Sequence, residues 1–130
     1  MFIFSVTQFI DKIDDSTSIR LFRYAGVWPV SPREFLICST VADLEDGSSM
    51  LSSISVSDAI FPVETGSGFV RAYILSSGVL ARNVGDGFCD LTMYTHVDLN
   101  GSFPMSIITM FAIANTAKQH KRYAEICGRH

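Results

Sequence analysis

The residue types that most often ligate metals or act as nucleophiles are few in this sequence. The three cysteines and three histidines are Cys38, Cys89, Cys127, His96, His120 and His130. No two cysteines form a CxxC pair, and no histidine stands at metal-ligand spacing from another histidine or from a cysteine. The pattern therefore predicts no metal site. We interpret the cysteines as free, buried thiols in a reducing compartment rather than as a disulfide framework.

Sequence motifs of the common enzyme classes are absent as well. The segment Gly66-Ser67-Gly68 lacks the third glycine of a dinucleotide-binding loop and does not open a helix, so we interpret it as a turn. His96 alternates with Tyr94 and Asp98, and an outward polar strand face explains this spacing better than a catalytic dyad does. We expect no enzymatic activity and no cofactor. Arg71, in an otherwise apolar segment, is interpreted as an ion-pair partner that ties a loop to the sheet, and so is Asp98.

Apolar periodicity predicts that strands precede the last quarter of the chain. The expected strands are residues 17–25, 34–42, 50–56, 69–75 and 88–99. Residues 6–13 fit a short helix or a strand equally well. The Ser-Ser-Gly segment 76–78 is predicted to turn the strand before it toward Val79 and Leu80, and residues 82–87 are predicted to form a long polar turn.

The last quarter of the chain predicts one long helix that ends near Cys127. Ser102 is a good N-cap, Pro104 is tolerated in a first turn, and Gly128 is a natural stop. Most residues from Met105 to Ala114 are apolar, so other elements must wrap this helix on several sides. Strands followed by one helix favour an α+β fold, in which a curved antiparallel sheet wraps on the long C-terminal helix.

Length and composition indicate a single domain over residues 1–130. The mean hydropathy of +0.29 is high, yet no uninterrupted apolar run approaches the length of a membrane-spanning helix. The N-terminal residues 1–4 do not include the basic segment with which a signal peptide begins. The net charge of −3 and the lack of a basic face with interleaved aromatics argue against nucleic acid as a partner.

Four segments resemble, in order and spacing, motifs of the START (steroidogenic acute regulatory protein-related lipid transfer) domains. Residues 10–19 resemble the family's V-L-D-D-x-T-x-I hairpin, and Pro32-Arg33-Glu34-Phe35 resembles its PRDF strand entry. Residues 68–72 look like its G-V-R-A strand, and residues 91–104 are similar to its passage from the last strand into the last helix. The matches extend over nearly the whole chain.

The resemblance implies a helix-grip fold that holds one lipid in a tunnel between the sheet and the C-terminal helix. It implies no catalysis, and it implies phospholipids, sterols or ceramides as the ligand class. It also implies a cytoplasmic protein that is peripheral at membranes, where the last helix loosens against the loops near residues 43–48 and 79–87. The chain matches only the C-terminal two thirds or so of such a domain, without the family's N-terminal helix and first strands. The tunnel arginine and acid of sterol-type members fall on Ser39 and near Arg20, so that charged pair is not retained.

The predicted tunnel residues come from three expected strands and the helix. They are Ile37, Ser39, Tyr73, Leu91, Met93, Ile107, Ile108 and Phe111. Ser39 and Tyr73 are the expected polar contacts, and ordinary core packing is the alternative at most positions. Two further hypotheses stay open: a truncated module that binds a protein partner, and an enzyme on the same scaffold. An unpaired edge at the first strand would favour self-association.

Overall fold

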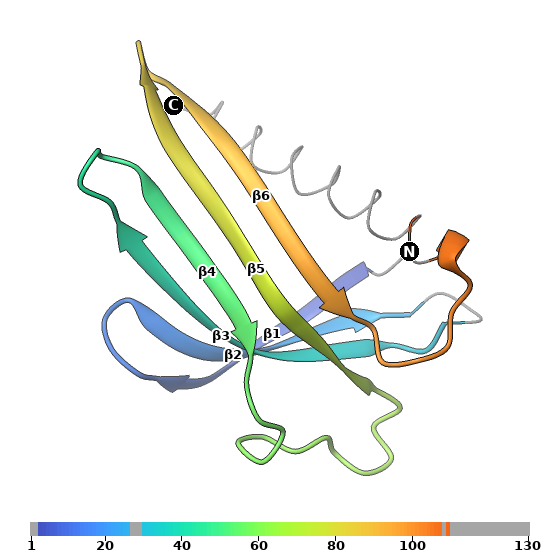
Figure 1. Cartoon of the computed structure of the whole chain (residues 1–130). Coiled ribbons are helices and arrows are strands. Elements are labelled where there is room, and N and C mark those ends of the chain that lie inside the picture. Colours follow the sequence, from blue (N-terminus) through green and yellow to red (C-terminus); the bar gives the residue numbers. More distant parts are fainter. Residues whose placement is uncertain (1–2, 27–29, 108, 110–130) are drawn as a thin grey trace.

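A curved six-stranded sheet dominates the computed structural model, which describes residues 3–26, 30–107 and 109 (Figure 1). Its strands are β1 (Ile3–Lys12), β2 (Thr17–Ala25), β3 (Arg33–Asp43), β4 (Ser49–Ser55), β5 (Val70–Gly85) and β6 (Phe88–Asp98). The strands lie in chain order, each antiparallel to the next, and the first residues of β5 also pair in parallel with β3. This confirms the expected curved antiparallel sheet. The open question at residues 6–13 is settled in favour of a strand.

Short turns join the strands where the sequence carries turn residues. The Ser16 amide donates to Asp14 Oδ1 at 2.8 Å between β1 and β2, and the Ser48 amide donates to Asp46 Oδ1 at 2.9 Å between β3 and β4. Because each bond stabilises the charged carboxylate, it lowers the pKa of Asp14 and of Asp46. Between β5 and β6, the three residues 85–87 all have positive φ, a conformation that glycine adopts freely at two of them.

The predicted turn at residues 76–78 is wrong, because β5 runs unbroken through this segment. Gly78 pairs with Ser52 of β4 on one side and with Tyr94 of β6 on the other. Backbone hydrogen bonds along both edges thus hold the segment extended, in spite of its turn-forming composition. The polar turn predicted for residues 82–87 is correspondingly shorter, since residues 82–85 belong to β5.

The sheet buries apolar side chains on both faces. We call the face that carries Phe35, Ile37 and Ala72 the inner face, and the face that carries Leu21 and Leu36 the outer face. On the inner face this cluster packs with residues from three strands and the segment after β6, namely Phe22, Tyr24, Ile74, Val97 and Leu99. The outer cluster adds Ile19 and packs against Ile10, Cys38, Val56 and Phe61. Residues 33–37 of β3 are buried without alternation, which is typical of a strand covered on both sides.

The chain turns back onto the inner face after β6. Phe103 and Ile107 pack against Val30 together with Tyr24 and Leu99. Residues 105–107 are helical, and the Ile107 amide donates to the Pro104 carbonyl at 3.0 Å, so the predicted helix begins at Met105. The rest of that helix lies outside the described residues. Within the described part, no helix is long and apolar enough to cross a membrane.

Candidate functional site

Strand register assembles the inner face into transverse rows, because directly paired residues of neighbouring strands point to the same side. One row, which we call the apolar row, crosses four strands. Its members are Val41, Leu51, Val79 and Met93. All are half-buried except Val41, which is exposed. Ala81 and Leu91 form the next pair toward the tip of the β5–β6 hairpin, so the face remains apolar in that direction.

A second row on the inner face consists of hydroxyl side chains, and we call it the hydroxyl row. It crosses five strands in unbroken register through Ser18, Ser39, Ser53, Ser77 and Thr95. Ser39 Oγ and Ser53 Oγ lie 2.8 Å apart and share a hydrogen bond. A hydroxyl has one donor and two acceptor positions, so this pair keeps capacity for a further partner. The inner face thus carries one polar row beside apolar ones.

The far end of the inner face is closed by packed aromatic residues. The rings of Tyr24 and Phe35 meet edge to face, with centroids 5.7 Å apart. Burial raises the pKa of the Tyr24 hydroxyl. The Arg33 guanidinium lies 5.1 Å from the centroid of the Phe103 ring, and its Nε donates to the Leu99 carbonyl at 2.8 Å. Burial lowers the pKa of Arg33. These contacts fix the chain that leads into the C-terminal helix.

The structure brings four of the predicted tunnel residues onto one face. Ile37 is buried at 6% exposure, and Ser39, Leu91 and Met93 are half-buried. Ile107 packs at the Val30 end of the same face. The predicted residues Ile108 and Phe111 lie outside the described residues. Contact of any of these residues with a lipid stays a prediction.

Tyr73 does not lie with the other predicted tunnel residues. Ala72 pairs with Phe35 on the inner face, so Tyr73, one position later in β5, points to the outer face. There the Tyr73 hydroxyl donates to Asp58 Oδ2 at 2.7 Å. This bond, with burial second, raises the pKa of Tyr73. Its neighbour Ile74 packs in the inner cluster instead.

A charged cluster holds the loop of residues 56–69 against the outer face. Arg71, only 3% exposed, donates to Glu34 Oε1 at 3.0 Å, to Asp58 Oδ1 at 3.1 Å and to the Phe61 carbonyl at 2.8 Å. Arg23 Nε donates to the other oxygen of Glu34 at 3.1 Å. This confirms the prediction that Arg71 ties a loop to the sheet. The cluster is structural, since it lies on the face opposite the hydroxyl row.

Asp98 and two cysteines differ from what the sequence suggested. Asp98 Oδ1 accepts a hydrogen bond from the Asn100 amide at 2.9 Å, and within the described residues it forms no ion pair. The thiols of Cys38 and Cys89 are free, but neither is fully buried, and Cys89 is exposed near the β5–β6 tip. Cys127 lies outside the described residues. The described residues hold no cluster of histidine, cysteine and acidic side chains that could bind a metal.

Sequence reasoning did not select Leu51, Val79, Ser53, Ser77 or Thr95. In β4, Leu51 and Ile54 are three positions apart and point to opposite faces, so the serines between them do not show which face Ser53 joins. The segment with Ser77 and Val79 was predicted to contain a turn, so it gave no strand pattern to interpret. Only the pairing of β5 with both neighbours places them in the two rows.

Comparison with known proteins gives a consistent result. The family model of the START domain matches residues 3–130. The human StAR-related lipid transfer protein 5 superposes with a TM-score of 0.86 over 98% of this chain, at 19% sequence identity. Human STARD10 superposes with a TM-score of 0.84 over 98% of the chain, at 18% identity. The lipid transfer and protein localization domain of human StarD13 (DLC2) shares 28% identity and has a TM-score of 0.68 over 78% of the chain.

The chain spans little more than half the length of these solved proteins. It covers 51% of the STARD10 chain, 51% of the StarD13 chain and 61% of the StAR-related lipid transfer protein 5 chain. A search of curated proteins found no similar sequence.

Proposed function

This chain belongs to the START domain family, and on that premise we propose that it binds one lipid molecule against the inner face of its sheet. The observation that carries the proposal is the apolar row with the hydroxyl row beside it. An acyl chain or ring system would lie along Leu51, Val79 and Met93, and each 100 Å² of apolar surface removed from water would contribute about 2.5 kcal/mol. Ser39 and Ser53 would hydrogen-bond the polar end of the lipid.

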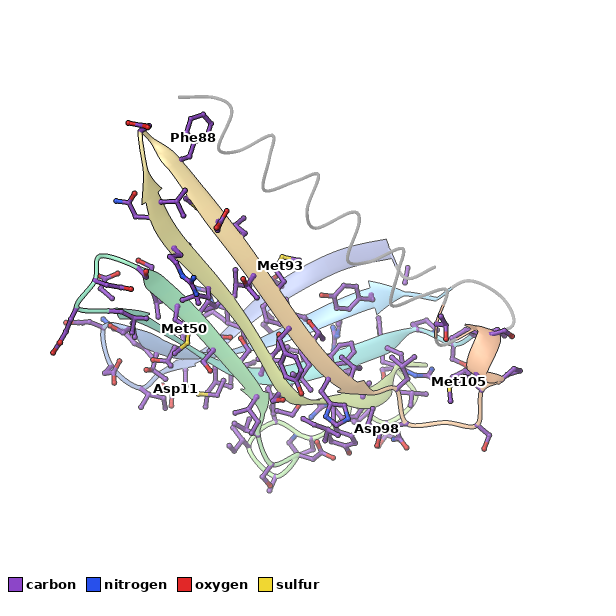
Figure 2. The ribbon with its side chains drawn as sticks, turned by 45° about the horizontal axis from the view of Figure 1, so that its top comes forward. Asp11, Met50, Phe88, Met93, Asp98 and Met105 are labelled. Carbon is purple, nitrogen blue, oxygen red and sulfur yellow. The ribbon has the colours of Figure 1, made fainter. Side chains whose placement is uncertain are left out.

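We further propose that the lipid is exchanged at a membrane surface by a cytoplasmic, peripheral protein. The tip of the β5–β6 hairpin, where Figure 2 labels Phe88, supports this step. Phe88 is 72% exposed and Val84 is 52% exposed. Exposed aromatic and aliphatic side chains at a hairpin tip can enter the acyl boundary of a bilayer. The nearby acidic residues Asp86 and Asp90 favour a membrane of low negative charge.

Native mass spectrometry of the purified chain, followed by lipid extraction from the same sample, tests the binding proposal. We expect one co-purified lipid per chain, and the extract would identify its class. A folded chain without any lipid, which also takes up none from mixed vesicles, would overturn the proposal. That result would favour the alternative, a module that binds a protein partner.

Two adjacent positions of β5 provide a matched pair of variants. Val79→Trp places a large ring on the inner face in the apolar row, and Leu80→Trp places the same ring on the outer face, where Leu80 pairs with Met50. We expect Val79→Trp to lose most of the bound lipid and Leu80→Trp to keep it. Circular dichroism verifies that both variants remain folded. Equal lipid content in the two variants would contradict binding at the inner face.

A further inference from the structure

Two cationic side chains stand at the β1–β2 end of the hydroxyl row. Lys12 of β1 pairs directly with Ser18 of β2, so it extends the row by one strand on the inner face. Arg20 follows Ser18 by two positions and therefore points to the same face, where it pairs with Ile37. Lys12 and Arg20 are thus diagonal neighbours, and such residues lie about 7–8 Å apart, within reach of long side chains. The inner face carries two positive charges beside its hydroxyl groups.

Neither cation is held by a buried acid. Among the described residues Arg20 forms no ion pair, and its guanidinium lies 5.8 Å from the centroid of the Phe9 ring, which opposes it on β1. A ring against its face leaves the in-plane N–H donors of a guanidinium available for an anion. Lys12 Nζ lies 3.0 Å from Asp15 Oδ1, but these side chains are 60% and 99% exposed. Solvent screens such a pair, so a bound anion can replace it at little cost.

The inner face offers little negative charge in return. Among the described strand residues, Asp43 is the only acid that the register places on this face. Its Oδ1 already accepts a hydrogen bond from Ser49 Oγ at 2.7 Å. Asp43 follows Ser39 by four positions in β3, so the two lie about 13 Å apart. The described strands therefore place no carboxylate beside the hydroxyl row that could receive an ammonium group.

We propose that Arg20 and Lys12 bind the phosphate of a phospholipid with net negative charge, whose headgroup carries hydroxyl groups and no ammonium. This inference rests on the proposed function, because it names the class of lipid held on the inner face. The Arg20 guanidinium donates two parallel N–H bonds to phosphate oxygens, and the Lys12 ammonium donates a third. The hydroxyls of Ser18 and Ser39 both donate and accept, which suits a polyol headgroup. A choline headgroup would instead bring a further positive charge to a face that is already cationic.

Competition between two lipids with identical acyl chains tests the charge preference. The chain is equilibrated with vesicles that contain phosphatidylglycerol and phosphatidylcholine in equal amounts, and native mass spectrometry measures which lipid it retains. We expect an excess of phosphatidylglycerol of about tenfold, the effect of one hydrogen bond to a charged group. Arg20→Gln should bring the two lipids close to parity without lowering the total lipid content. Arg20→Lys, which keeps the charge, should retain most of the preference.

Arg82→Gln is the matched control, because it removes the same charge from the outer face, where Arg82 pairs with Asp90. It should leave the ratio of the two lipids unchanged, and circular dichroism verifies that each variant is folded. A chain that holds one lipid without preference would overturn this inference and leave lipid binding intact, and so would an unchanged preference in Arg20→Gln. A chain that holds neither lipid would overturn both proposals.

Free anions distinguish a lipid headgroup from a soluble phosphate as the occupant. Inorganic phosphate and glycerol phosphate are added separately to the chain loaded with phosphatidylglycerol. We expect either anion, even in large excess, to displace little of the lipid, because neither makes the apolar contacts of the acyl chains. Displacement at a concentration equal to that of the lipid would identify a site for free anions and would overturn the assignment of a lipid headgroup.

Discussion

Removing the Arg71 guanidinium should lower the free energy of unfolding strongly, although Arg71 lies on the face opposite the hydroxyl row. Arg71→Met deletes the donors to Glu34, Asp58 and the Phe61 carbonyl but keeps most of the side-chain volume. Among the described residues, Glu34, which is 1% exposed, would keep only Arg23 as a charged partner. A buried charge that loses its partner destabilises a protein by about 3–5 kcal/mol. Because Arg23 remains, we expect a loss of about 3 kcal/mol.

Two companion variants separate the sources of this loss. Asp58 is 43% exposed, so solvent screens its ion pair, and Asp58→Asn should lower the free energy of unfolding by only about 0.5 kcal/mol. In the double variant Glu34→Gln/Arg71→Met no buried carboxylate is left without its partner, so its loss should be smaller than the sum of the two single losses. Such a shortfall would identify the stranded carboxylate as the main cause.

Urea unfolding followed by far-UV circular dichroism measures these free energies. Limited proteolysis of the loop of residues 56–69 adds a local readout, since Arg71 holds that loop through Asp58 and Phe61. A loss below about 1 kcal/mol for Arg71→Met, or one equal to that of Asp58→Asn, would refute the assignment of the buried pair as the anchor of the outer face.

Three further changes test other parts of the structure. Tyr73 has its pKa raised above the ordinary 10.0 by its bond to Asp58, so this bond stabilises fully below that pH and its contribution is lost as the pH rises through the raised pKa. Tyr73→Phe should therefore flatten the alkaline fall of the urea midpoint, and an unchanged fall would contradict this. Gly26→Ala should abolish soluble expression or lower the melting temperature sharply, because its Cβ would collide with the backbone carbonyl of Val30; a wild-type melting curve would disprove the close approach. Ile37→Ala should lower the free energy of unfolding by about 2–5 kcal/mol, measured in urea, and a smaller loss would show that the site collapses around the cavity.

The sequence predicted the strands whose pattern is set by their own residues. β2 was predicted at residues 17–25, where it lies, and the start of β6 was predicted at Phe88, where it begins. The centre of β5 was not, because Ser76, Ser77 and Gly78 are turn formers by themselves and become strand only between two neighbours. Local propensity cannot report a partner that is distant in the chain.

The candidate site shows the same division. Ile37 and Met93 were assigned to a common face, and strand register places them there. Tyr73 was assigned to that face too, but Tyr73 and Ile74 are both large and apolar in character, so alternation could not tell which points inward. The hydroxyl row emerges only from the register of five strands, since its members are ordinary surface residues when each strand is considered alone.

The double pairing of β5 has a consequence for the order of folding. Apart from the pairings of β5 with β4 and β3, the described strand pairs are local hairpins. Residues 3–55 and residues 70–98 can therefore each form without waiting for the other. Among the described strands, the two parts are joined by backbone pairing only through β5, which pairs with β4 and, at Arg33–Phe35, with β3. Forming these pairings, which we call the seam, closes the loop of residues 56–69, and this is the entropically costly step. Substitutions at the seam, such as those at Glu34 and Arg71, should therefore slow folding, whereas substitutions in β1 should mainly speed unfolding.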